Sequence, residues 1–166
     1  RRDLAERLIA IADKYEVSPE YINLEITETA SISARATLLA NMKKLMDYGF
    51  KFSLDDFGKG ESNLMYVVEM PVSIVKLDYD LTKAFFGSSK AKLVLRAVVS
   101  MAHGMELKLV AEGIETKEEL IGMCKEGIDY IQGFYYSKPL PMWEYLDFIE
   151  KNNVNYIAKK RDTEEE

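Results

Sequence analysis

Two adjacent carboxylates, Asp55 and Asp56, close a short apolar run and are followed at once by a glycine-containing loop, in the segment KFSLDDFGKGESN at residues 51–63. Successive side chains of a strand point to opposite faces, but neighbouring side chains can converge where the chain turns out of the sheet. Two converging carboxylates favour a bound cation. A polar turn in which an Asp caps the next helix gives the same local pattern, so the pair alone leaves both interpretations open.

The same arrangement recurs along the chain: a helix, a glycine and an apolar strand lead to an acidic or polar residue near the strand end. Strands are predicted at residues 21–27, 50–55, 73–78, 106–112 and 128–132. The residues near their ends that could do chemistry are Glu25, Asp55 with Asp56, Lys76, Glu112 and Gln132. The repetition favours the cation site over a chance polar turn.

Apolar residues at helical spacing predict the helices that position these strands. They cover residues 4–15, 33–49, 62–69, 90–103, 117–126 and 142–151. Thr116 and Glu119 form a capping box for the fifth helix, and Cys124 is expected to be a small core residue of that helix. The fourth helix is expected to bury the stripe Leu93, Val94, Ala97, Val98 and Met101.

Strands that alternate with helices indicate βαβ units and therefore a parallel α/β sheet. The two candidates are a doubly wound sheet and a (β/α)8 barrel. No strand is followed by G-x-G-x-x-G or by a Walker loop, so the nucleotide-binding version of the doubly wound sheet has no support. In a barrel, the carboxyl ends of all strands meet on one face, where such enzymes place their chemistry.

Composition limits the class of protein. The 166 residues are 48% hydrophobic and 30% charged, which predicts one soluble domain with a real core. No apolar stretch reaches the roughly 18 residues of a membrane span, and the N-terminus has no signal-peptide pattern, so a cytoplasmic location is expected. The net charge of −6 argues against binding of polymeric nucleic acid, and the single cysteine excludes an internal disulfide.

Five segments, in order, resemble the successive signatures of the EAL domain family. They are LEITET at 24–29, LDDFGKGESNL at 54–64, VKLD at 75–78, VAEGIET at 110–116 and QGFYYSKPL at 132–140. The resemblance covers residues from about 21 to 140. It implies a modified TIM barrel that hydrolyses the bacterial messenger cyclic di-GMP to linear pGpG with Mg²⁺ or Mn²⁺.

The resemblance also implies roles for individual residues. The implied metal ligands are Glu25, Asp55, Asp56 and Glu112. The implied catalytic residues are Lys76, which orients the attacking water, Glu112, as metal ligand or general base, and Gln132, which supports the water and metal cluster. Glu28 and Glu115 match acidic residues that surround this centre. Two divalent ions suit the reaction, because they generate hydroxide at neutral pH and stabilise both the attacking and the leaving oxygen.

The sequence departs from the family pattern in two places. The Glu-Ala-Leu strand and an asparagine-bearing strand are absent before residue 24, and a whole barrel needs about 250 residues, so about 80 N-terminal residues are expected to be missing. Residues 1–158 are therefore interpreted as the C-terminal portion of an EAL domain with about five strands, and 159–166 as a charged tail. The loop DDFGKGESN replaces the more usual DDFGTGYSS, with Lys59, Glu61 and Asn63 at the altered positions.

These departures keep other functions open. The chain by itself is expected to be weakly active or inactive. It could instead be a silent EAL-like module that binds cyclic di-GMP or a protein partner, or, as a more distant alternative, a different metal-dependent barrel enzyme. Self-association is expected through the loop after Asp56 or through the exposed sheet edge at the Glu25 strand.

Overall fold

The computed structural model of the chain describes residues 3–27, 35–59 and 64–162, with side chains described up to residue 152. The predicted helix start at residue 33 and the candidate residue Glu28 lie outside these ranges. The chain forms two units, which divide between Tyr135 and Tyr136. The first contains the whole sheet, and the second contains helix α7 (Met142–Asp162), which continues beyond the predicted end at residue 151.

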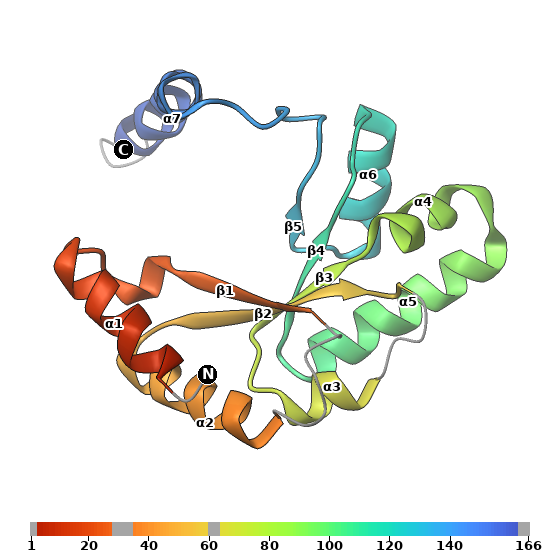
Figure 1. Ribbon diagram of the computed structural model, residues 1–166. Coiled ribbons are helices and arrows are strands. Elements are labelled where there is room, and N and C mark those ends of the chain that lie inside the picture. Colours follow the sequence, from red (N-terminus) through yellow and green to blue (C-terminus); the bar gives the residue numbers. More distant parts are fainter. Residues whose placement is uncertain (1–2, 28–34, 60–63, 163–166) are drawn as a thin grey trace. The chain divides into compact units, whose positions relative to one another are not determined.

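The first unit is built on a five-stranded parallel sheet (Figure 1). Its strands are β1 (Asn23–Thr27), β2 (Lys51–Phe57), β3 (Ile74–Leu77), β4 (Lys108–Ala111) and β5 (Tyr130–Ile131). Each strand pairs with the next strand in the chain, so the spatial order is β1-β2-β3-β4-β5. A doubly wound sheet reverses its order at a switch point, whereas this sheet advances in one direction as a barrel wall does. Among the described strands, β1 and β5 each have a neighbour on one side only.

The described part of the first unit has six α-helices. They are α1 (Leu4–Lys14), α2 (Arg35–Tyr48), α3 (Leu64–Glu69), α4 (Tyr79–Gly87), α5 (Ser89–Gly104) and α6 (Lys117–Glu126). All but α4 follow the predicted alternation. The capping box of Thr116 and Glu119 is confirmed at the start of α6, and Gly127 ends that helix in the left-handed conformation. In Figure 1, α2, α3, α5 and α6 lie along one side of the sheet.

Three expectations about the helices are wrong. Helix α4 was not predicted, although Asp78 caps it by accepting a hydrogen bond from the backbone N–H of Asp80 at 2.9 Å. Helix α5 buries Leu95, Val99 and Ala102, while the expected Leu93 and Val94 are exposed. Cys124 is also exposed, because α6 turns the neighbouring Met123 into the core instead. In α5 and in α6, more than one set of apolar residues has helical spacing, and the spacing alone does not show which set faces the core.

The sheet has one apolar and one polar face. Leu54, Leu77, Leu109 and Ala111 are fully buried and belong to the core that the helices cover. The residues of β1, β2 and β3 that face the other side are largely polar, and they include Asn23, Glu25, Ser53, Asp55 and Lys76. Because parallel partners in register face the same side, the pairing of Glu25 with Ser53 and of Thr27 with Asp55 sets these polar residues on a common face.

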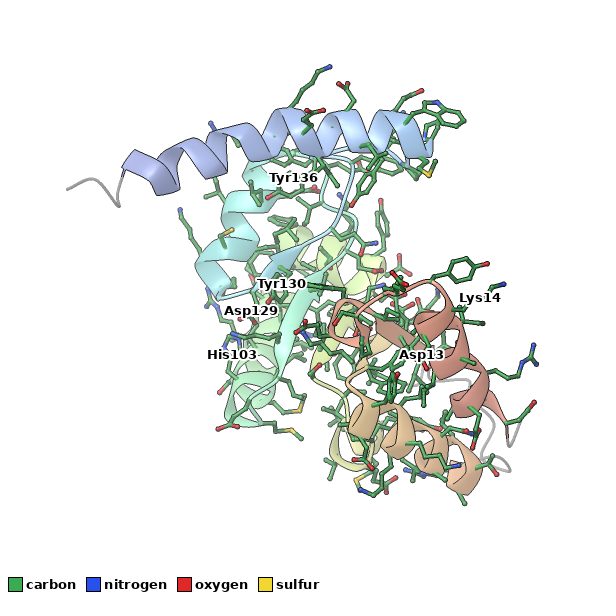
Figure 2. The ribbon with its side chains drawn as sticks, turned by 90° about the vertical axis from the view of Figure 1, so that its left-hand side faces the viewer. Asp13, Lys14, His103, Asp129, Tyr130 and Tyr136 are labelled. Atoms are coloured by element: carbon green, nitrogen blue, oxygen red, sulfur yellow. The ribbon has the colours of Figure 1, made fainter. Side chains whose placement is uncertain are left out.

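A separate ionic cluster connects the amino-terminal ends of β4 and β5. Asp129, just before β5, contacts Lys108 Nζ at 2.7 Å and His103 Nε2 at 3.0 Å, and accepts a hydrogen bond from the backbone N–H of Leu109 at 3.0 Å. Figure 2 shows His103 and Asp129 side by side. Burial alone would raise the pKa of Asp129, but the hydrogen bonds from Lys108, Leu109 and His103 outweigh it and lower this pKa to about 2.

The Asp129 cluster gives a prediction about acid stability. A carboxylate whose pKa is lowered by folding stabilises the protein above its unfolded pKa, and this contribution disappears as the pH falls towards the folded pKa of about 2. We expect Asp129→Asn to cost about 1 kcal/mol at pH 7 and to differ progressively less from the wild type between pH 5 and pH 2. Urea unfolding across this range measures it, with Asp47→Asn, in an exposed pair with Lys43, as control. A difference that stays constant with pH would contradict the expectation.

Within the stretches that the structure describes, no helix is long and apolar enough to cross a membrane.

Candidate active site around Lys76

Three carboxylates from different segments converge on the ammonium group of Lys76 in β3. Lys76 Nζ lies 2.9 Å from Glu25 Oε1, 2.9 Å from Asp55 Oδ1 and 2.8 Å from Glu112 Oε1. Glu25 lies in β1, Asp55 lies in β2, and Glu112 follows β4 directly. These four residues are called the Lys76 cluster below. Residues spread over almost 90 positions of the sequence are thus gathered at one place on the polar face of the sheet.

Pairing of the strands explains this convergence. Lys76 is in register with Val110, and Leu77 is in register with Ala111, so Glu112 follows at the carboxyl end of the next strand. The loop after Glu112 is fixed by the segment that follows β5: the backbone N–H of Ile114 donates to Gln132 O at 3.2 Å, and that of Tyr135 donates to Ile114 O at 2.9 Å. A Cβ on Gly133 would lie 2.0 Å from Ile114 O, so only glycine allows this close approach.

Burial and charge give Lys76 an unusual environment. The residue is 7% exposed, whereas the Glu25 side chain is 48% exposed and opens the cluster to solvent. Burial alone would lower the pKa of Lys76, but its contacts with Glu112, Asp55 and Glu25 outweigh burial and raise this pKa above its ordinary value. Lys76 therefore stays protonated at neutral pH and balances one of the three carboxylates.

The Lys76 cluster has the chemistry of a divalent-cation site. With the three carboxylates ionised, one ammonium leaves two negative charges uncompensated, which is the charge that one divalent ion carries. Asp55 Oδ1 is buried and, among the described residues, has the ion pair with Lys76 but no hydrogen bond of good geometry. Carboxylate oxygens are the ligands that Mg²⁺ and Mn²⁺ prefer. The residues thus fit a divalent ion in type and charge.

In this structure, however, the three carboxylates of the Lys76 cluster are arranged around the lysine ammonium group. In the part of the chain that the structure describes, no three His, Cys, Asp or Glu side chains are grouped closely enough to hold a metal ion by themselves. Binding of a cation would therefore require the carboxylates of the cluster to rearrange relative to Lys76.

Asp56 lies beside the cluster and has a different partner. Strand β2 does not end at Asp55 but continues to Phe57, and its register with β3 shifts between Leu54 and Phe57. At this bulge Asp56 has φ of 57°, in the left-handed region. Its Oδ1 lies 3.3 Å from Lys59 Nζ. The two adjacent carboxylates therefore face different ammonium groups, and a bulge inside the strand, rather than its end, redirects the second.

Glu115 and Gln132, the other two predicted residues that the structure describes, have different surroundings. Glu115 precedes α6, and its Oε2 is 4.0 Å from Lys83 Nζ of α4. Gln132 follows β5 directly, and its side chain is exposed. Asn23 and Ser53 were not predicted as site residues, although they share the polar face and are linked by a 2.8 Å hydrogen bond from Asn23 Nδ2 to Ser53 Oγ. Strand alternation with Glu25 and Asp55 was the signal that could have identified them.

Comparison with known proteins supports one family. The EAL domain model matches residues 1–139. The cyclic di-GMP phosphodiesterase RocR of Pseudomonas aeruginosa is 33% identical over 147 residues, which are 89% of this chain and 38% of RocR.

Solved structures agree with this match. The EAL enzyme Bd1971, solved with cAMP and cyclic di-GMP, superposes with a TM-score of 0.84 and 30% identity over 90% of this chain and 39% of that chain. BlrP1 of Klebsiella pneumoniae, solved with manganese and cyclic di-GMP, gives a TM-score of 0.76 and 29% identity over 84% of this chain and 35% of its own. The chain thus spans about two fifths of these relatives or less. The five-stranded sheet is part of a TIM-barrel-like domain, and the chain belongs to the EAL domain family.

Proposed function

We propose that this chain is the C-terminal part of an EAL-type phosphodiesterase domain, which hydrolyses cyclic di-GMP to linear pGpG with Mg²⁺ or Mn²⁺. The observation that carries the proposal is the convergence of Glu25, Asp55 and Glu112 within 2.9 Å of Lys76 Nζ. Three carboxylates held together without enough positive charge are costly unless a cation joins them. The activity named for RocR and the ligands of the BlrP1 structure support the same assignment.

The proposal assigns a role to each residue. Glu25, Asp55, Asp56 and Glu112 would hold the cations, which supply a water molecule activated for attack on phosphorus and stabilise negative charge on oxygen. Lys76 carries a permanent positive charge and three N–H donors, so it can orient a water molecule or a phosphate oxygen at the open side of the cluster. Glu112 could also accept a proton from that water. Gln132, Glu28 and Glu115 would support this centre from the surrounding loops.

The proposal extends to the organisation of the protein. Residues 1–158 would be the domain portion and 159–166 a charged tail, and a cytoplasmic location follows from a cyclic di-GMP substrate. The free edge of β1 is where further barrel strands, or a second copy of the chain, would pair. Self-association through that edge or through the loop after Asp56 is therefore part of the proposal, and the chain by itself is expected to turn over weakly or not at all.

A second candidate is a silent EAL-like module that binds cyclic di-GMP or a protein partner. The observation in its favour is that the carboxylates contact lysine ammonium groups, Lys76 and Lys59, instead of forming a cluster ready for metal among the described residues.

One assay separates the two candidates. Cyclic di-GMP and Mn²⁺ are mixed with this chain and with a version extended upstream in its natural sequence, and linear product is measured by chromatography. We expect cleavage by the extended version at a rate at least about 100-fold above that of the chain alone, because the chain's sheet is open at β1. Binding without cleavage by both proteins would support the silent module. Absence of both binding and cleavage would contradict the phosphodiesterase and a silent module that binds cyclic di-GMP, and would favour a different metal-dependent enzyme.

A further inference from the structure

Asp55 and Asp56 each contact a lysine: Asp55 contacts Lys76 of β3, and Asp56 contacts Lys59, which lies just after the end of β2. Lys59 Nζ lies 3.3 Å from Asp56 Oδ1 and 3.9 Å from Asp78 Oδ2. Its side chain is 61% exposed, so it is not needed to fill the core. Among the residues that the structure describes, the ion pairs of the Lys59 ammonium group are with these two carboxylates.

The backbone brings Lys59 over Asp56. The left-handed conformation of Asp56 reverses the chain, and the backbone N–H of Lys59 donates to Asp56 O at 3.1 Å. This turn directs the ammonium group back onto the carboxylate of the residue that forms the turn.

Asp78 is the second carboxylate near the Lys59 ammonium group. It is 5% exposed, and its Oδ1 accepts from the backbone N–H of Asp80 at the start of α4. Its backbone N–H donates to Phe57 O at 3.0 Å, which joins the end of β3 to the end of β2. Asp78 is therefore fixed in place, and its Oδ2 faces the same ammonium group as Asp56 does.

We propose that Lys59 is a positioning residue that acts as a tethered counter-ion of Asp56 and thereby weakens the binding of a divalent cation by this carboxylate. The inference rests on the proposed function, since it concerns the cation requirement of the same site. An ammonium group and a divalent cation on one carboxylate repel each other, and at about 5 Å in a water-like dielectric with physiological salt the repulsion corresponds to roughly five- to tenfold in affinity. Asp55, one residue earlier, is instead held by Lys76, so the two carboxylates would differ in their affinity for cations.

Mn²⁺ titration tests this inference without any activity measurement. The number and the dissociation constants of bound Mn²⁺ are determined from the electron paramagnetic resonance signal of free Mn²⁺, for the wild-type chain and for Lys59→Ala, Lys59→Arg and Lys43→Thr. We expect Lys59→Ala to bind Mn²⁺ roughly five- to tenfold more tightly, while Lys59→Arg, which retains the charge, stays close to the wild type. Lys43 forms an exposed pair with Asp47 on α2, so its removal controls for the loss of one positive charge.

A double variant identifies the carboxylate through which Lys59 acts. Asparagine tolerates the left-handed conformation of residue 56, so Asp56→Asn is expected to fold. The gain from Lys59→Ala should vanish in the Asp56→Asn background. Equal Mn²⁺ affinity of wild type and Lys59→Ala, or a gain that persists without Asp56, would overturn the role of Lys59 and leave the proposed function standing. Absence of Mn²⁺ binding in every variant would overturn the cation requirement itself, and the inference with it.

Discussion

Replacing Lys76 by methionine should destabilise the first unit by about 3 kcal/mol when divalent cations are removed with EDTA. Methionine retains most of the side-chain volume but leaves Glu25, Asp55 and Glu112 without their shared ammonium group. Removing one partner of a buried ion pair costs about 3–5 kcal/mol, and we take the lower end because Glu25 is 48% exposed. Urea unfolding measured by circular dichroism gives the change in the free energy of unfolding.

Mn²⁺ should restore much of this lost stability. In Lys76→Met the three carboxylates are free of the competing ammonium group, and a ligand that binds only the folded state stabilises it. The increase in unfolding free energy on adding Mn²⁺ should therefore be larger for Lys76→Met than for the wild type. Lys51→Met, at the exposed start of β2, is the matched control and should change little in either condition. A Lys76→Met variant as stable as the wild type in EDTA would contradict the central position of Lys76.

Replacing Asp55 by asparagine should lower the phosphodiesterase rate of the upstream-extended protein by about 100-fold or more. Mutation of residues that merely support metal ligands costs about 10- to 100-fold, and a direct ligand should cost at least as much. Asparagine has nearly the same shape as aspartate, so the strand pairing of β2 should be retained. The turnover number measured at saturating cyclic di-GMP and Mn²⁺ reports the effect.

The control for this prediction is Asp47→Asn, which removes a carboxylate from an exposed helix pair with Lys43. It should leave the turnover number within a factor of about two. An Asp55→Asn enzyme that retains wild-type turnover, with wild-type stability, would show that Asp55 does not contribute to the reaction.

The fold was largely predictable from the sequence because its signals are local. Alternating apolar strands and capped helices predicted the parallel sheet, and the capping box at Thr116 and Glu119 is as expected. The gathering of Glu25, Asp55, Lys76 and Glu112 was also predictable, because in a parallel sheet residues near the carboxyl ends of neighbouring strands must come together.

Other features depend on tertiary structure and could not be predicted in the same way. The bulge at Asp56 is a register shift against β3, which a pattern within one strand does not specify. The choice of Leu95 over Leu93 for the core of α5 depends on how the helix is rotated against the sheet. The contact of Asp56 with Lys59 depends on the path of a loop, and the contact of Glu115 with Lys83 depends on how α4 lies against the start of α6.

Mn²⁺ binding by the chain and by its Asp55→Asn variant is the most direct test of the central claim, that the carboxylates around Lys76 hold a divalent cation. The electron paramagnetic resonance signal of free Mn²⁺, followed during titration, gives the affinity of each protein. We expect saturable binding by the wild-type chain and an affinity at least about tenfold lower for Asp55→Asn. Equal affinities, or no saturable binding by the wild-type chain, would contradict it.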